Sequence, residues 1–342
     1  MALGTKLLNA WEHVLGRCGV GQGHSVVILI GAIANPDNVV AARLAAERIG
    51  ARVLMMELGE PPLLAMAGDT SAYLGPTGLQ GNRPAVEALK AAYIVVDLMG
   101  IDRGTEQQEI LDAGARILLV KEPPDVLIRL LPNEEDKRRV TEAAQRLKRA
   151  KSLQVTSATG TNMTLALGEY PLLVQYGLAD EPGRWDHWPG AFVATWPNEQ
   201  SAEGMVVLSP GDAILPFKHY VREPIYLTIE AGRIRRIEGS FDADYLREYM
   251  ESFKDPEGYA VSHLGWGLQR RSSWTALGMY DKRQTNGMES RSFDGNFMFS
   301  TGPNAEAGGN RHTPCHLDIP MRNCSVFLDG EAVVESGRTV AT

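Results

Sequence analysis

The chain lacks an apolar run long enough to cross a bilayer. Its most apolar stretch, Ser25 to Ile33, is much shorter than the roughly 20 residues that a spanning helix needs. The amino-terminal segment MALGTKLLNAWEHVLGR carries Glu12 and His13 inside its apolar run and has no small-residue cleavage site. This pattern argues against a secretory signal, and we expect no membrane partner.

Cysteine is also scarce. The three cysteines, Cys18, Cys315 and Cys324, are an odd number and too widely spaced for a disulfide framework. Disulfides persist mainly in oxidising compartments. We therefore expect a soluble cytoplasmic protein with reduced thiols.

Concentrated positive charge is missing as well. The chain has 34 Lys and Arg against 42 Asp and Glu, a formal net charge of −8. Its longest basic block is the KRR run at 137–139. Nucleic-acid binding needs a basic face that displaces counterions, so nucleic acid is excluded as an expected partner. Low-complexity segments and internal repeats are absent too.

The length of 342 residues and the hydrophobic content of 44% predict two domains of roughly 150 residues each. Residues 1–150 alternate between β-branched runs and amphipathic stretches, which indicates a parallel sheet with right-handed crossovers. This domain is expected to be a Rossmann-like α/β scaffold. Its predicted strands are 25–31, 52–58, 93–99 and 116–122, and its predicted helices are 36–51, 82–92, 105–115, 124–131 and 133–152.

Residues 151–342 have a different pattern. Short alternating runs, at 153–159, 162–168, 204–209, 225–232 and 234–240, are separated by Gly, Pro, Asn and Asp, as in a mixed or antiparallel sheet. One clear helix is predicted at 242–255. The second domain is therefore expected to be α+β. It contains five of the seven histidines and every tryptophan except Trp11, so we expect the chemistry here.

The segment GVGQGHS at 19–25 is similar to a glycine-rich phosphate loop. A dinucleotide fingerprint follows a strand and opens a helix, whereas this segment follows a predicted helix and precedes a strand. We interpret it as a helix carboxyl terminus and a turn.

The segment RHTPCHLDIPMRN at 311–323 concentrates metal-binding side chains. If CHLDIPM is extended, His316 and Asp318 point to the same face and can bind one ion. Cys315 points the other way, and His312 precedes Pro314, so its direction is open. The alternative is a hydrogen-bonded core histidine beside an aspartate that caps a turn.

A third ligand must come from elsewhere in the chain. His263, in YAVSHLGWGLQ, is preferred because its neighbours are small and apolar, and because Gly265 and Gly267 permit close approach. The other candidates are His13, His24, His187 and His219. Two imidazoles and one carboxylate form a facial triad, which leaves three positions open and suits Fe(II). The spacing alone does not separate Fe(II) from Mn(II) or Zn(II).

Several long segments resemble the 2,5-dihydroxypyridine 5,6-dioxygenase family, iron-dependent ring-cleaving enzymes of bacterial nicotinate and hydroxypyridine degradation. The resemblance covers essentially the whole chain and is looser in the first half. The segments that carry it are DEPGRWDHWPG (180–190), TWPNEQSAEG (195–204), DAILPFKHY (212–220), SHLGWGLQ (262–269), GNFMFSTGPN (295–304) and TPCHLDIPMRNC (313–324). More distant relatives are thermophilic-type aminopeptidases, which share a late His-x-Asp motif.

The resemblance implies Fe(II) held by His263, His316 and Asp318, with O2 as co-substrate. It also implies that the C5–C6 bond of 2,5-dihydroxypyridine, a small aromatic N-heterocycle, is opened to give N-formylmaleamate. A two-domain subunit in a homo-oligomer, with a hexamer expected, belongs to the same picture.

The chain departs from the family near residues 100–104. Family members carry a histidine there with a plausible role in proton transfer, whereas this chain reads GIDRG. Either Asp102 or Arg103 takes over the role, or it falls to His187, our candidate for the base that removes the 5-hydroxyl proton. A related hydroxypyridine as substrate is a further interpretation.

Other side chains receive more modest assignments. Ser300 is a candidate for a hydrogen bond to a ring oxygen, although a turn role fits equally well. Arg291 is a candidate contact for the anionic substrate or product, with a surface ion pair as the alternative. Trp185, like Trp188 and Trp266, is a candidate for stacking on the ring or for simple core packing. Glu203 is predicted to orient a histidine ligand.

Two rival functions differ in testable ways. A dinuclear metallo-aminopeptidase-like hydrolase predicts two metals per chain and no need for O2, and it requires several more carboxylates, one of them bridging the ions. A non-catalytic small-molecule-binding protein predicts no tightly held metal. The clustered histidines of the second half favour the dioxygenase.

Overall fold

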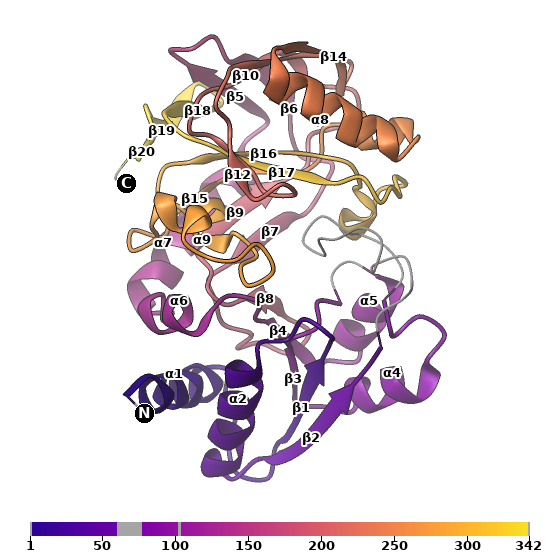
Figure 1. Ribbon diagram of the computed structural model, residues 1–342, viewed down its shortest axis with the longest axis vertical. Coiled ribbons are helices and arrows are strands. Elements are labelled where there is room, and N and C mark those ends of the chain that lie inside the picture. The colour runs from indigo at the N-terminus through magenta and orange to yellow at the C-terminus, as the bar shows by residue number, and fades with distance from the viewer. Residues whose placement is uncertain (1, 60–76, 102–103, 341–342) are drawn as a thin grey trace.

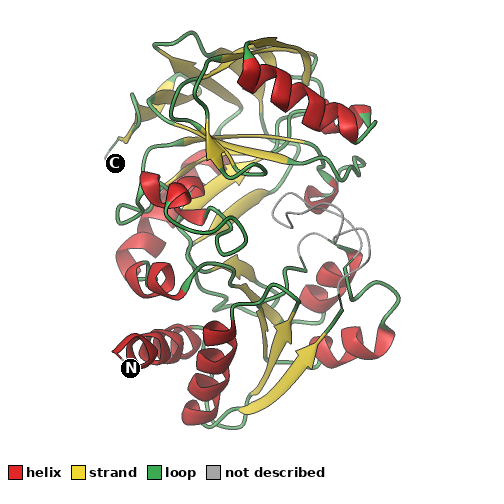
Figure 2. Cartoon of the chain, viewed as in Figure 1, coloured by secondary structure: helices red, strands yellow, loops and turns green. Residues whose placement is uncertain are grey.

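The computed structural model describes residues 2–59, 77–101 and 104–340. Figure 1 shows a parallel sheet with its helices in the lower part and a group of antiparallel sheets in the upper part. Helices surround the lower sheet, whereas strands dominate the upper part (Figure 2). The expected combination of a Rossmann-like α/β part and an α+β part with antiparallel sheets is confirmed.

The lower sheet has five strands that all run parallel. In spatial order these are β2 (Arg52–Glu57), β1 (Ser25–Ile30), β3 (Ile94–Asp97), β4 (Arg116–Leu119) and β8 (Trp185–His187). The helices in the first 150 residues are α1 (Ala2–Arg17), α2 (Pro36–Ile49), α4 (Arg83–Lys90), α5 (Thr105–Asp112), α6 (Pro124–Arg129) and α7 (Glu134–Arg149).

Both faces of this sheet are covered. Val26 and Ile28 of β1 pack into the main apolar core together with side chains of α1 and α2. Val27 and Leu29, which point to the opposite face, pack with side chains of α4 and α5 in a second cluster. The two helix pairs lie on opposite sides of the sheet (Figure 1). Burial on both faces explains why these strands are continuous apolar runs.

Strand β8 comes from beyond residue 150, where the sequence places the domain boundary. Trp185 to His187 pair with Ile117 to Leu119 of β4 in parallel register, and this segment is not among the strands predicted from the sequence. His187 consequently lies at the carboxyl end of its strand, the edge at which open α/β sheets bind ligands.

The ends of α2 coincide with local sequence signals. The Asn35 side chain accepts hydrogen bonds from the Asp37 and Asn38 amides, Pro36 occupies the first turn, and Gly50 ends the helix with φ of 86°. The glycine-rich segment 19–25 follows α1 and precedes β1, and Gly19 has φ of 80°. It is therefore a helix-ending turn, as predicted, since a phosphate loop would open a helix.

The upper part contains three antiparallel sheets. The eight-stranded sheet consists of β14 (Arg233–Gly239), β13 (Ile225–Glu230), β10 (Glu203–Leu208), β6 (Asn162–Ala166), β5 (Ser152–Ser157), β18 (Cys324–Leu328), β19 (Glu331–Glu335) and β20 (Arg338–Thr339). The five-stranded sheet, called sheet C below, consists of β17 (Leu317–Met321), β16 (Phe297–Thr301), β15 (Leu264–Gly267), β9 (Phe192–Thr195) and β7 (Leu172–Gln175). The smallest pairs β11 (Ala213–Ile214) with β12 (His219–Tyr220).

Alternation along the strands of sheet C separates a core face from a second face. Val193, Trp266, Phe299 and Ile319 belong to the main core, and α7 packs along β7 and β9. The other face carries a small separate cluster, Phe192, Ala194, Met298 and Leu173. The remaining helices of the upper part are α8 (Phe241–Ser252), α9 (Met288–Arg291) and the short 3-10 helices η2 (Pro256–Tyr259), η3 (Trp274–Gly278) and η4 (Ala305–Ala307).

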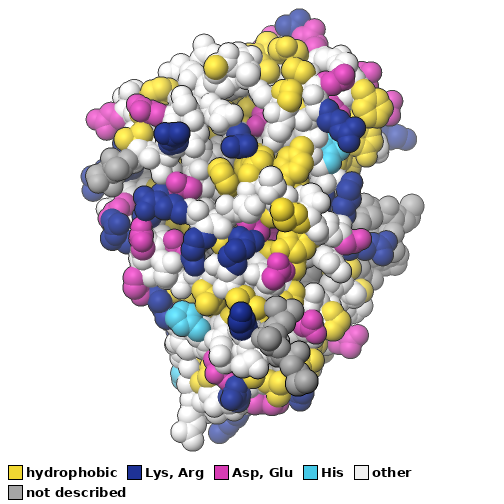
Figure 3. All heavy atoms as spheres, turned by 60° about the vertical axis from the view of Figure 1, so that its left-hand side comes forward, with side chains coloured by type: hydrophobic (Ala, Val, Ile, Leu, Met, Phe, Trp, Pro, Cys, Tyr) yellow, Lys and Arg dark blue, Asp and Glu magenta, His cyan; other side chains and the backbone are white. Residues whose placement is uncertain are grey.

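Three further features concern the chain as a whole and its surface. Within the described residues, no helix combines the length and apolar character that crossing a membrane would require. On the face shown in Figure 3, basic side chains are interspersed with acidic and apolar ones. Among the surface ion pairs of the molecule, Arg138 pairs with Glu142 and Arg270 pairs with Glu135. The three cysteine side chains are free and buried.

A buried aspartate next to sheet C gives a test of the fold by pH. Asp212 is 2% exposed and accepts hydrogen bonds from the Ser209 and Arg322 amides, each 2.7 Å long. Burial raises the pKa of Asp212 to about 6, and the hydrogen bonds from the two backbone amides only partly oppose this shift. A raised pKa means that the contribution of Asp212 to stability is full below pH ~3.9 and is lost as the pH rises through about 6.

We expect the free energy of unfolding to fall between pH 4 and pH 7 by about 3 kcal/mol more in the wild type than in Asp212→Asn, since one pKa unit corresponds to about 1.4 kcal/mol. Urea unfolding at several pH values measures both slopes. Parallel slopes for the two proteins would show that Asp212 titrates normally in the folded chain.

Candidate metal centre

The strand register of sheet C brings three predicted ligands to one face. Asp318 of β17 lies directly across from Ser300 of β16. On the other side of β16, Gly265 of β15 pairs with Met298, so His263, two residues earlier, lies in the same row as Ser300. His316 precedes Asp318 by two residues and shares its face. Residues from three strands therefore converge on one point.

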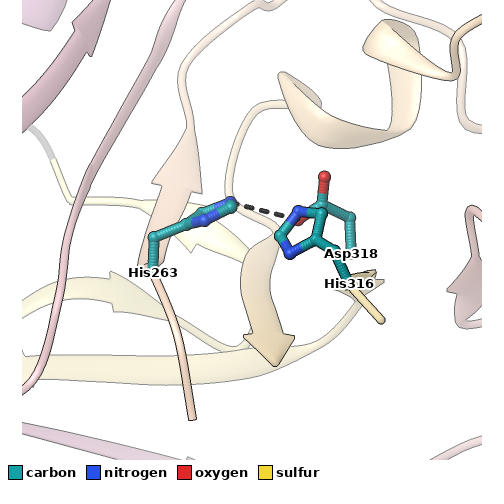
Figure 4. Close-up of side chains that lie close together, drawn as sticks. All are labelled: His263, His316 and Asp318. Carbon is teal, nitrogen blue, oxygen red and sulfur yellow. Dashed lines mark ion pairs between the residues drawn. The ribbon is translucent and has the colours of Figure 1, made fainter. Parts of the chain in front are cut away.

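The three side chains are buried and close together. His263, His316 and Asp318 are each 2% exposed, and one donor atom from each lies within 4.8 Å of the others. The Asp318 Oδ1 atom is 3.0 Å from His263 Nε2 and 3.2 Å from His316 Nε2. Figure 4 shows the two imidazoles directed at this carboxylate.

The other nitrogen of His316 is held by a hydrogen bond, and a carboxylate lies near the other nitrogen of His263. His316 Nδ1 is 2.8 Å from the Thr301 carbonyl oxygen, and because a carbonyl only accepts, this contact places the proton on Nδ1 and leaves the Nε2 lone pair for a cation. His263 Nδ1 faces the Glu306 carboxylate, with 3.9 Å to Oε1. A carboxylate on this side favours the same tautomer for His263.

The second oxygen of Asp318 is occupied. Arg291 of α9 contacts Oδ2 through Nε at 2.8 Å and through a terminal nitrogen at 2.5 Å. Burial alone would raise the pKa of Asp318, but the charge of Arg291, together with the imidazoles of His316 and His263 when they are protonated, outweighs it and holds this pKa well below its usual range. The carboxylate is therefore ionised and directs only Oδ1 toward the imidazoles.

These residues fit a single cation. When the imidazole protons are on Nδ1, Asp318 Oδ1 is a buried acceptor that meets two Nε2 lone pairs, although a buried polar atom normally has a donor as its partner. For metal–ligand bonds of about 2.1 Å, two ligands at a right angle are about 3.0 Å apart, which matches the 3.0 and 3.2 Å separations. Two imidazoles and one carboxylate oxygen leave three of six octahedral positions open for other ligands.

The predicted substrate contacts have defined surroundings. Ser300 lies within this cluster, and its hydroxyl donates a 2.6 Å hydrogen bond to the His263 carbonyl oxygen. Arg291 lies there too, bound to Asp318. Trp185 packs against the apolar cluster of the parallel sheet, whereas Trp188 and Trp266 belong to the main core.

His187 and the described residues that directly follow β3 lie at the carboxyl edge of the parallel sheet. His187 ends β8 and is 3% exposed, and its amide donates to the Asp186 carboxylate at 2.7 Å. Asp97 ends β3 and accepts hydrogen bonds from the amides of residues 99–101. Asp102 and Arg103, predicted to replace the family histidine, lie outside the described residues.

Glu203 lies at the start of β10 and is exposed. Its carboxylate accepts a 2.7 Å hydrogen bond from the Ala231 amide, so it serves the turn between β13 and β14. The sequence analysis predicted that Glu203 orients a histidine ligand. The carboxylate that faces His263 is Glu306, which the sequence analysis did not single out.

A polar network fixes the segment that carries Glu306. Arg311 binds both Glu199 carboxylate oxygens at 2.7 Å and donates to the Gly302 and Val261 carbonyl oxygens. Asn304 donates to the same Glu199 carboxylate and accepts from the Arg311 amide. Glu306, with an 11% exposed side chain, is thereby held beside His263. No sequence motif signals this arrangement, because it depends on how the 302–311 segment folds back.

We expect Glu306→Gln to weaken metal binding by ~10- to 100-fold, the usual effect of removing a carboxylate that orients a histidine ligand. Glutamine keeps the size of the side chain and removes its charge. Competition for Fe(II) against a chelator of known affinity measures the change.

Glu203→Gln is the matched control, since it makes the same substitution at an exposed carboxylate that contacts Ala231. It should leave the metal affinity unchanged. If Glu203→Gln instead weakened binding and Glu306→Gln did not, the assignment from sequence would be right and the one from structure wrong.

Comparison with known proteins gives a consistent result. The family model described as 2,5-dihydroxypyridine 5,6-dioxygenase matches residues 6–341. A protein of Pseudomonas putida strain KT2440 named 2,5-dihydroxypyridine 5,6-dioxygenase is 53% identical over 339 residues, which cover 98% of this chain and 96% of that protein.

Two solved structures are also similar. The structure titled as 2,5-dihydroxypyridine dioxygenase from Pseudomonas putida KT2440 superposes with a TM-score of 0.97 at 52% identity, covering 99% of this chain and 98% of that one. Wild-type AmpT from Thermus thermophilus has a TM-score of 0.59 at 14% identity over 98% and 99% of the two chains, a likeness of fold alone. Sequence, family model and structure agree over nearly the full length, and the chain belongs to the 2,5-dihydroxypyridine 5,6-dioxygenase family.

Proposed function

We propose that the chain is an Fe(II)-dependent enzyme that opens the C5–C6 bond of 2,5-dihydroxypyridine with O2 and yields N-formylmaleamate. The observation that carries the proposal is the buried cluster of His263, His316 and Asp318, in a chain 53% identical to a protein of that name. Both atoms of O2 enter the product, so no external reductant is required.

In this proposal the two imidazoles and Asp318 Oδ1 hold the iron, which when bound supplies a meeting point for the ring substrate and O2. Arg291 keeps Oδ2 engaged, so the carboxylate offers one oxygen and does not occupy a further position. Thr301 and Glu306 keep the Nε2 atoms directed inward. The burial of all three ligands limits access of bulk water.

The remaining roles concern the substrate. We assign His187 as the base that takes the 5-hydroxyl proton, since an imidazole is the side chain that titrates unassisted near neutral pH. Ser300 is assigned a hydrogen bond to a ring oxygen, which its hydroxyl oxygen can accept while its proton is donated to the His263 carbonyl. Arg291 and Trp185 are further proposed substrate contacts, and Asp102 or Arg103 is proposed to replace the missing family histidine.

The deciding experiment is anaerobic loading with Fe(II), followed by O2 uptake with 2,5-dihydroxypyridine while its ultraviolet absorbance is recorded. We expect one O2 per ring, only with Fe(II). If a fully loaded protein consumes no O2, the proposal is wrong, and a metal content of one or two per chain then separates a shifted ring substrate from dinuclear hydrolysis.

We also propose that the protein acts in the cytoplasm as a homo-oligomer, a hexamer, on a small ring substrate and without a nucleic-acid partner. The net charge of −8 and the three buried thiols support this setting. Light scattering coupled to size-exclusion chromatography tests it, and a 37.3 kDa species would contradict it.

A further inference from the structure

Trp196 is a buried tryptophan that borders the candidate metal centre. It directly follows β9, and because Thr195 pairs with Leu264 in antiparallel register, Trp196 lies across from His263. The two rings are 5.7 Å apart between centroids, at an interplanar angle of 64°. Trp196 is 3% exposed, yet it belongs to none of the apolar clusters formed by the described residues.

The indole N–H of Trp196 has no hydrogen-bond partner within the described structure. Buried polar groups are normally paired. Two other tryptophans share this feature, but Trp11 packs edge-on against Trp188 in the main core and Trp185 packs on the second apolar cluster. Of the three, Trp196 alone contacts a candidate metal ligand, so its unpaired N–H belongs to a side chain that borders the candidate site.

The surroundings of Trp196 suit a flat ring. Alternation along β9 places Phe192 and Ala194 on the same face as Trp196, and these two pack with Met298 and Leu173. This apolar surface adjoins the polar cluster of His263, Ser300 and Asp318 on sheet C. A ring bound here would meet apolar side chains along its body and polar groups at its oxygens.

The chemistry of the indole selects one oxygen. Indole N–H is only a donor and cannot take the 5-hydroxyl proton. The 2-oxygen, in the lactam tautomer of the ring, is a carbonyl that only accepts, and it stays a carbonyl in the ring-opened product. A fixed donor therefore matches the 2-oxygen through the whole reaction.

We propose that the Trp196 indole N–H donates a hydrogen bond to the 2-oxygen of the ring substrate, and that Trp196 thereby selects hydroxypyridines that carry an oxygen at this position. The proposal rests on the proposed function, because it takes the same ring as substrate. The proposal adds a specificity-determining residue that contacts the end of the ring opposite the reacting oxygen.

The test measures anaerobic binding to the Fe(II)-loaded protein of 2,5-dihydroxypyridine and of 3-hydroxypyridine, which keeps the reacting hydroxyl and lacks the 2-oxygen. Trp196→Phe removes the N–H and keeps an aromatic ring. We expect it to weaken binding of 2,5-dihydroxypyridine about tenfold, the usual loss for one buried hydrogen bond. Binding of 3-hydroxypyridine should be unchanged.

Trp11→Phe is the matched control. It removes another unpaired indole N–H, from a tryptophan that packs against Trp188 in the main core and not against a candidate metal ligand. It should change neither affinity. Equal losses for both ligands in Trp196→Phe, or no loss for either, would overturn the proposal. If Trp196→Phe does not fold, the wild type still decides, because equal affinity for the two ligands would show that nothing in the site reads the 2-oxygen.

Failure of the proposed function gives a different result. In that case the Fe(II)-loaded wild type neither binds 2,5-dihydroxypyridine nor consumes O2 with it. A wild type that binds and cleaves the ring, combined with an unaltered Trp196→Phe, refutes the role of Trp196 alone.

Discussion

Replacing Asp318 by alanine is expected to abolish both iron retention and ring cleavage. Asp318 Oδ1 is the atom that both imidazoles face, at 3.0 and 3.2 Å, and its removal leaves two neutral ligands. A metal ion supplies several kcal/mol of transition-state stabilisation, so its loss should lower kcat/KM by ~10³-fold or more. His316→Ala should behave in the same way. Iron content after desalting and O2 uptake measure the two effects.

The variant also leaves a buried cation unpaired. Arg291, with a 12% exposed side chain, loses the carboxylate that it binds, and breaking a buried pair costs about 3–5 kcal/mol. Iron loss through partial unfolding must therefore be separated from loss of a ligand. Asp294→Ala is the control, since it breaks another ion pair with a buried arginine. The Arg139 side chain in that pair is 9% exposed, and Asp294 is not one of the candidate metal ligands.

Asp294→Ala should lower the thermal midpoint and retain iron. Asp318→Ala should lose iron even at temperatures where circular dichroism shows it folded. If Asp318→Ala or His316→Ala still binds one iron per chain and turns over, the three-ligand site is incorrect.

The local part of this site was predictable from sequence. The His316-x-Asp318 spacing places two side chains on one face of any extended segment, and β17 has that conformation. Helix caps at Asn35 and Gly50 and the apolar runs of the parallel strands follow from equally local rules. Such features depend on a few neighbouring residues, and the structure contains them within a few residues of their predicted bounds.

Features that depend on long-range pairing were not predictable in the same way. His263 was chosen among five histidines from its small, apolar neighbours, but what brings it to Asp318 is the pairing of β15 with β16 and of β16 with β17. Trp196 is adjacent to His263 only because of the β9–β15 register. A register shift of one residue would turn either side chain to the opposite face.

Short elements and returning segments were missed for a related reason. Strand β8 has only three residues, too few to show alternation, and its partner β4 is distant in sequence. Glu306 reaches His263 because the Arg311–Glu199 pair holds the 302–311 segment in place. Glu203 was predicted to orient a histidine ligand, and in the structure its carboxylate instead accepts a hydrogen bond from the Ala231 amide.

Replacing His187 by glutamine is expected to separate metal binding from proton transfer. His187 is buried at the carboxyl end of β8, and its backbone N–H donates a hydrogen bond to the Asp186 carboxylate. The same carboxylate also binds Arg184. Glutamine retains hydrogen-bonding capacity but cannot take a proton near neutral pH. The variant should keep one iron per chain and lose ~10²- to 10⁴-fold in rate, the usual contribution of a general base.

The pH profile distinguishes a base from a structural histidine. In the wild type, kcat/KM should rise with pH as the free imidazole forms and then level off, and this acidic limb should be absent in His187→Gln. His312→Gln is the matched control, since His312 is exposed and close in sequence to the metal cluster; it should retain iron, rate and the acidic limb. Wild-type activity in His187→Gln would exclude His187 as the base and direct attention to Asp102 and Arg103. An arginine side chain stays charged and an unperturbed aspartate ionises well below neutral pH, so a profile that keeps its acidic limb in His187→Gln would also point away from His187 as the base.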